Sequence, residues 1–231
     1  MSITSEWNSK QKHLKEIIRK PELFDEAMKL FLEMHKSVHF SEVSNSKVST
    51  LMDKLWEGLQ INEFAVMPTQ KDETIAWGIW HITRIEDLTI NILVDESKQV
   101  LNDKWLMRMN TKTTDTGNAM NEDEIMDFSK GINIDALKAY RIAVGQKTQK
   151  ILSSLKAEDL KRKVRHQQLT KILNEHGVLE HPDSIWLLDF WGKKDIAGII
   201  LMPITRHQIM HINAGFNIKQ ALQKKKEFYR I

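Results

Sequence analysis

The chain has 231 residues, no cysteine, few glycines and prolines, and a formal net charge of +3 with both signs spread along its length. This composition is typical of a soluble helical protein, and the lack of cysteine excludes disulfides, thiolate metal ligands, iron–sulfur clusters and a thiol nucleophile. The N-terminus lacks the basic start and apolar run of a signal peptide, and no apolar stretch is long enough to span a bilayer, so a cytoplasmic protein is expected. No basic stripe interleaved with aromatic residues suggests nucleic acid as a partner.

Two helices are predicted at the N-terminus, over residues 5–20 and 21–39, because apolar residues recur there at helical spacing. A shorter apolar stripe follows over 48–59. His35 and His39 fall in the last turn of the second helix, where the helix dipole favours imidazolium. Metal binding is the alternative interpretation of these two histidines, but the sequence offers no evident third ligand for them.

The segment 72–94 carries the clearest helical pattern in the chain. Thr69 and Asp72 have the spacing of a capping box, and apolar residues then repeat at helical spacing for several turns. His81 lies within this apolar helix, where a core histidine bonded to a neighbouring helix is the simplest interpretation. Gly78 costs about 1 kcal/mol relative to alanine in a helix interior, so we expect another group to approach closely there.

A polar segment over residues 96–132 separates this helix from the next long one. It holds a predicted short helix at 100–109, a polar loop at 111–118 and a second helix at 121–130. We interpret it as a crossover connection, which allows its two flanking helices to run parallel, whereas a short turn forces antiparallel neighbours. Asn133 then caps the long regular helix that follows.

The last third of the chain is also predicted to be helical. We expect a polar helix at 157–175, with His166 and His176 at the surface, and His181 in a turn before Pro182. An apolar run then leads into the closing helix.

The start of that closing helix reads MPITRHQIMHIN and places His207 and His211 four residues apart. Both imidazoles leave one face of the helix about one turn apart, the spacing at which two neutral imidazoles can share a metal ion. Pro203 either lies in the first turn of this helix or kinks a longer one. Two imidazoles seldom hold a divalent ion against water, so this motif requires further ligands.

Two of these segments together resemble the DinB-like (damage-inducible) superfamily of metal-binding four-helix proteins. The segment IAWGIWHITRIED, residues 75–87, is similar to the family's second-helix motif, with a tryptophan shortly before a ligand histidine and an acidic residue soon after. The segment TRHQIMHIN is similar to the last-helix motif, in which two histidines complete a three-histidine site. The likeness extends over roughly residues 40–223.

The resemblance implies an all-α fold, a single domain over 1–231 built as a DinB-like four-helix bundle. Residues 1–40 then form an N-terminal helical extension, and the 96–132 crossover is an insertion. A homodimer is expected from the same resemblance.

The resemblance also implies which histidines bind a metal: His81, His207 and His211. Three neutral histidines keep the full +2 charge of a divalent ion and leave a position for water or substrate. Zinc is the first choice, with nickel, iron or manganese as alternatives that imidazole also suits. The family's characterised enzymes imply a metal-dependent thiol S-transferase or hydrolase acting on a small molecule, with a low-molecular-weight thiol as cosubstrate and metal-bound water or thiolate as the reacting group.

Candidate pocket residues around these histidines are Arg84, Arg206, Trp80 and Asn213. By spacing, the two arginines could reach an anionic substrate, the alternative being surface cations. Glu86 and Asp87 do not share the helix face of His81, so neither is expected to orient it. Two other hypotheses stay open: a non-catalytic, stress-associated metal-binding protein, and a helical protein whose histidines are structural.

Overall fold

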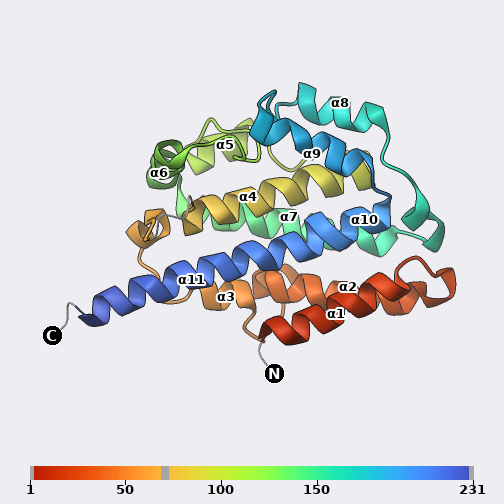
Figure 1. Ribbon diagram of the computed structural model, residues 1–231, viewed down its shortest axis with the longest axis horizontal. Helices are drawn as coiled ribbons and strands as arrows, with labels where there is room; N and C mark the ends of the chain where they lie inside the picture. The colour runs from red at the N-terminus through yellow and green to blue at the C-terminus, as the bar shows by residue number, and fades with distance from the viewer. Residues whose placement is uncertain (1–2, 69–72, 229–231) are drawn as a thin grey trace.

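The computed structural model describes residues 3–68 and 73–228, and it is built from helices (Figure 1). The α-helices are α1 Ile3–Ile17, α2 Phe24–Val38, α3 Leu51–Trp56, α4 Ile75–Leu88, α5 Asp103–Met109, α6 Glu122–Gly131, α7 Ile134–Ser154, α8 His166–Asn174, α9 Pro182–Gly192, α10 Ile196–Leu201 and α11 His207–Phe228. Short 3-10 helices occur at Pro21–Leu23, Ser41–Ser44, Ile61–Ala65 and Ala157–Lys161, and π-helical turns at Thr89–Val94 and Met202–Arg206. Within the described ranges the only β-type pairing is one isolated bridge between Lys163 and Asp195. The all-α prediction is confirmed.

Helices α2, α4, α7 and the continuous run from α10 into α11 meet at the centre of the molecule (Figure 1). Contacts between α4 and α7 advance together along both helices, from Thr83 with Arg141 to Glu86 with Thr148. The two helices therefore run parallel, which is an arrangement that the long crossover between them allows. Pro203 lies in the π-helical turn between α10 and α11, so it interrupts a longer helix, one of the two arrangements expected for it.

Residues 1–40, expected as an extension, supply one of these central helices. His35 of α2 contacts Glu86 of α4, and the carbonyl of Val38 accepts a hydrogen bond from Arg141 of α7. Helix α2 is therefore a member of the bundle, with α1 packed on its outer side.

Helix α4 is buried on nearly every face. Its charged residues Arg84, Glu86 and Asp87 have no solvent exposure, so each must find a partner inside the protein. Thr74 caps the N-terminus of α4 by accepting from the backbone N–H of Trp77. The capping box predicted at Thr69–Asp72 lies outside the described residues.

The prediction of a single helix over 157–175 is wrong. A 3-10 turn at Ala157–Lys161 is followed by an extended stretch, and α8 begins only at His166. Val164 donates its backbone N–H to Lys194, and Ile196 donates to Arg162. These bonds to the start of α10 draw the chain out of helical geometry.

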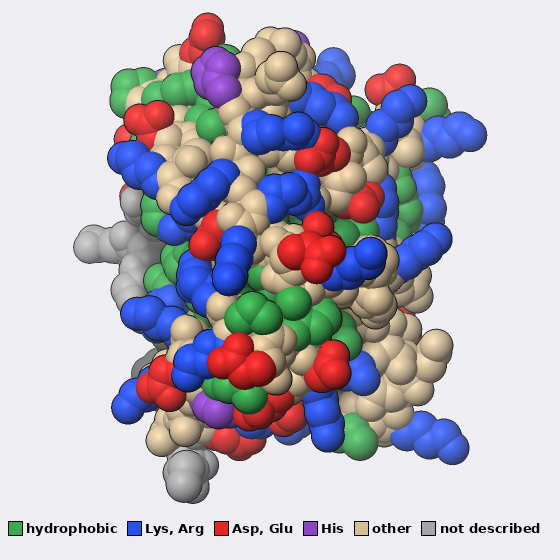
Figure 2. All heavy atoms as spheres, turned by 90° about the vertical axis from the view of Figure 1, so that its right-hand side faces the viewer, with side chains coloured by type: hydrophobic (Ala, Val, Ile, Leu, Met, Phe, Trp, Pro, Cys, Tyr) green, Lys and Arg blue, Asp and Glu red, His purple; other side chains and the backbone are tan. Residues whose placement is uncertain are grey.

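The face at the right of Figure 1 carries basic and acidic side chains interspersed (Figure 2). Ion pairs such as Arg162 with Glu96 and Arg19 with Asp195 join distant segments of the chain. None of the described helices has the length and apolar character that crossing a lipid bilayer requires.

Candidate metal centre

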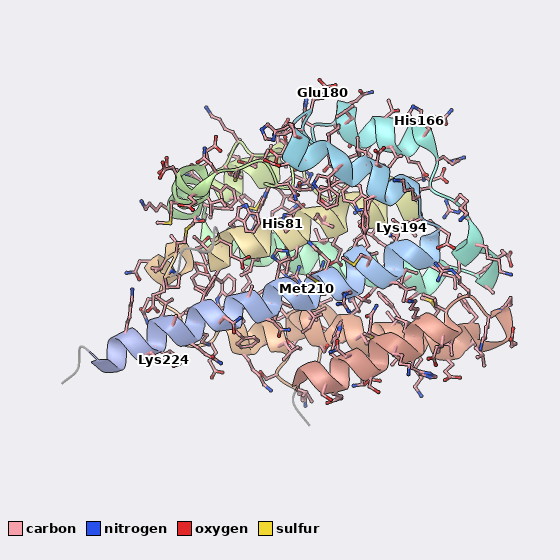
Figure 3. All side chains as sticks on the ribbon, viewed as in Figure 1. His81, His166, Glu180, Lys194, Met210 and Lys224 are labelled. Carbon is pink, nitrogen blue, oxygen red and sulfur yellow. The ribbon has the colours of Figure 1, made fainter. Side chains whose placement is uncertain are left out.

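Three histidine rings from two helices converge between α4 and α11. The Nε2 atoms of His81 and His207 are 3.2 Å apart, and the ring centroids of the three histidines lie 4.7–5.0 Å from one another. Each residue offers one nitrogen within 4.8 Å of the others, which is close enough for one ion to bind all three. Figure 3 places His81 on α4 beside the stretch of α11 that holds Met210, which directly precedes His211.

The tautomer of His81 is set by a backbone carbonyl. Its Nδ1 donates to the oxygen of Thr116 over 2.7 Å, so Nε2 presents a lone pair toward His207. Burial lowers the pKa of His81 to about 3 and holds the pKa of His207 well below its ordinary value. Both rings are therefore neutral near pH 7, the form in which imidazole binds a metal.

The crossover loop orients the face of α4 that carries His81. Four successive carbonyls accept hydrogen bonds from four side chains of α4: Thr114 from Arg84, Asp115 from Trp80, Thr116 from His81 and Gly117 from Trp77. These side chains share one helix face because they are three, four and seven residues from the first of them. The segment 96–132 thus fixes the orientation of the candidate ligand His81.

The family model of the DinB superfamily matches residues 46–213, which is most of the chain and includes all three histidines. The chain belongs to the DinB superfamily. A search of curated proteins returns no match. In this DinB-superfamily protein α1 and α2 precede the matched range, although α2 is one of its central helices.

Trp77 contacts the site, although the sequence analysis placed it only on the face of His81 and did not name it as a pocket residue. Its indole stacks on His81 with centroids 4.8 Å apart and an interplanar angle of 9°, and it meets His211 edge-on at 6.0 Å. The signal was its position four residues before His81, which places both rings on one helix face. Trp80, named instead, is fully buried against Phe128 and does not line the site.

The other pocket candidates do not assemble around the histidines. Arg84 is fully buried, and all five of its guanidinium N–H groups donate to protein acceptors, so the proposed role in binding an anion is wrong. Arg206 is exposed in the turn before His207. Asn213 lies two residues after His211, about 200° around the helix from it, so the two do not share a face.

Gly78 does not mark a close approach, contrary to the prediction. A Cβ built on it meets nothing within 4 Å. Gly78 instead borders a narrow, mostly apolar cleft between α3, α4 and α11, together with Glu73, Gly215 and His211. The glycine therefore leaves space beside the candidate metal site.

Gly117 is the glycine whose replacement we expect to disturb the site. Its φ of +76° is unfavourable for other residues, and an added Cβ would lie 2.8 Å from Nε1 of Trp77. Gly117→Ala is expected to destabilise the protein by about 1–3 kcal/mol and to shift tryptophan fluorescence, measured by urea unfolding. Gly131→Ala is the control, because Gly131 has open space and an ordinary φ. A Gly117→Ala variant as stable as the control would contradict this account.

The second histidine pair forms a different kind of cluster. Glu86 accepts hydrogen bonds of 2.9 Å from Nε2 of both His35 and His39, and one of 2.7 Å from Thr148. Glu86 is the third potential ligand beside His35 and His39, which the sequence did not reveal. The three residues lie close enough together to hold an ion. As expected, neither Glu86 nor Asp87 forms a hydrogen bond to His81. Asp87 instead accepts hydrogen bonds from Tyr140 and Arg84.

Proton positions distinguish this cluster from the three-histidine site. Burial by itself raises the pKa of the Glu86 carboxyl, but His39 and His35 hold it well below its usual value. An ionised carboxylate only accepts, so both Nε2 atoms carry protons, whereas Nε2 of His81 carries a lone pair. The buried Arg141 guanidinium supplies the balancing positive charge. We therefore interpret His35, His39 and Glu86 as a hydrogen-bonded clamp between α2, α4 and α7.

The clamp is expected to make the stability of the protein sensitive to acid. Burial lowers the pKa of His39 from 6.5 to about 3, so between these values the unfolded chain binds a proton that the native protein does not. Stability should therefore fall with falling pH, by about 1.4 kcal/mol per unit from this residue, measured by urea unfolding with a chelator present. His81 contributes in the same direction. His39→Gln should be less stable at pH 7 and show a shallower slope; equal slopes would refute the assignment.

Proposed function

We propose that the protein is a metal-dependent enzyme that binds one divalent ion through His81, His207 and His211 and catalyses thiol-dependent transfer or hydrolysis on a small molecule. The observation that supports this proposal best is the state of His81: neutral, anchored through Nδ1, and facing His207 with Nε2. Membership of the DinB superfamily agrees with it.

The donor set fits a divalent ion. Three neutral imidazoles suit zinc first, and also nickel, iron or manganese. When bound, such an ion supplies Lewis acidity that activates water or a thiol. The protein's own groups have positioning roles, since Thr116 and Trp77 hold the ring of His81, and the lack of a side chain at Gly78 leaves the adjoining cleft open.

The test begins with the protein purified without a nickel column. We expect about one equivalent of metal per chain, measured by elemental analysis. We then expect the metallated protein to consume low-molecular-weight bacterial thiols with an electrophile such as chloro-dinitrobenzene, or to hydrolyse simple esters or amides. The His211→Ala variant should lose both metal and turnover. Less than about a tenth of an equivalent in the wild type, unchanged in the variant, would exclude the metal site.

The second candidate is a stress-associated metal-binding protein without turnover. The narrowness of the cleft beside the histidines favours it, because a substrate of ordinary size would need that cleft to widen. A fully metallated sample with no thiol consumption and no hydrolysis above buffer would support this candidate over the enzyme.

A further inference from the structure

Glu73 lies at the edge of the three-histidine site, just before the N-cap of α4. Its Oε2 atom is 3.4 Å from Nδ1 of His211, and about a fifth of each side chain is exposed. Nδ1 of His211 is itself enclosed and has no hydrogen-bond partner. The contact is an ion-pair distance and is longer than a good hydrogen bond.

A metal-binding histidine usually donates its second ring N–H to a carboxylate or a carbonyl, which fixes the ring and raises its basicity. His81 already has such an acceptor in the carbonyl of Thr116. For His211, coordination through Nε2 leaves a proton on Nδ1, and the carboxylate of Glu73 lies next to that atom.

We propose that Glu73 is a positioning residue that accepts the Nδ1–H of His211 and holds this ring in the orientation for metal binding. The inference rests on the proposed function, because it assumes that the three histidines bind an ion. It adds a role for a residue outside the ligand set.

The charge of Glu73 also acts on the site. Three neutral imidazoles leave the full +2 charge of an ion uncompensated, and one nearby carboxylate lowers the local sum to +1. Because Coulomb attraction is strong in a partly buried site, this charge retains a divalent ion more tightly. It also makes the open positions less attractive to anionic ligands.

The test is a cobalt(II) titration of the metal-free full chain. Glu73→Ala removes the acceptor and the charge, and we expect affinity to fall about 10–100-fold. Glu73→Gln keeps an oxygen acceptor without the charge, so its affinity should be intermediate. Glu180→Ala is the control, since Glu180 is exposed and Figure 3 shows it far from His81. Circular dichroism verifies that each variant is folded.

The ligand-field absorption of bound cobalt separates positioning from direct coordination. If Glu73 positions His211, the spectrum of Glu73→Ala matches that of the wild type at saturation, because the nitrogen donors are unchanged. A changed spectrum would make Glu73 a ligand and overturn the inference, as would an affinity within about twofold of the control. If the wild type itself does not bind cobalt, the proposed function fails because there is no metal site. The inference about Glu73 then fails as well, and this outcome is distinguishable from one in which the wild type binds cobalt and Glu73→Ala binds it equally well.

Discussion

Replacing Glu86 with alanine is expected to destabilise the protein by about 3–5 kcal/mol, the usual cost of removing one partner from a buried charged cluster. The substitution leaves the N–H groups of His35 and His39 without an acceptor. It also leaves Arg141 as an uncompensated buried cation. Urea unfolding at pH 7 in the presence of a chelator measures the change without a contribution from metal.

Two variants make this result specific. Glu16→Ala removes the same side chain from an exposed position of α1 and should change stability by less than about 0.5 kcal/mol. Glu86→Gln keeps one oxygen acceptor, and one histidine can change tautomer to accept from the new amide, so its loss should be smaller than that of Glu86→Ala.

A double-mutant cycle between His39 and Glu86 then measures their coupling. Contacting buried groups should give an interaction energy of about 0.5–3 kcal/mol. Additive effects in this cycle would show that the clamp between α2 and α4 does not stabilise the fold.

Replacing His81 with alanine is expected to weaken metal binding by more than about 100-fold. Loss of an outer-shell partner alone costs 10–100-fold, and His81 is proposed as a direct ligand. Only His207 and His211 would remain, and two imidazoles seldom hold a divalent ion against water. Competition of the metal with a chromophoric chelator measures the affinity.

His166→Ala is the matched control, because it removes an exposed histidine that Figure 3 shows at the far end of the molecule from His81. It should bind metal like the wild type. If His81→Ala and His166→Ala are both folded and bind the metal equally well, the three-histidine site is refuted. The clamp of His35, His39 and Glu86 is then the next candidate for the metal site.

Local patterns predicted most of the helices and pointed to three histidines that lie close together in the structure. His207 and His211 share a helix face by spacing alone, and the resemblance added His81. Asn133 was correctly predicted as the N-cap of α7, where its side chain accepts from Ala136. Such features depend on neighbours a few residues away, which the sequence displays directly.

The buried polar groups could not be predicted in the same way. Glu86 meets His39 from 47 residues away and Thr148 from 62 residues away, so no local pattern contains the cluster. Arg84 was named as a candidate by its spacing from His81, and an arginine is rarely as fully buried as this one is. The carbonyls of the crossover loop that satisfy it carry no sequence signal, since every residue has one.

The histidines that converge between α4 and α11 are separated by 126 residues of chain, from His81 to His207. An ion bound by both histidines would cross-link the chain into a loop of that length. Closing such a long loop removes much conformational entropy from the unfolded chain. His207 and His211 follow helices α1 to α10 in the chain, so the three histidines can come together only after those helices have been synthesised. If an ion binds there as proposed, it would be captured after α4 and α7 have been synthesised, and it would link α4 to α11.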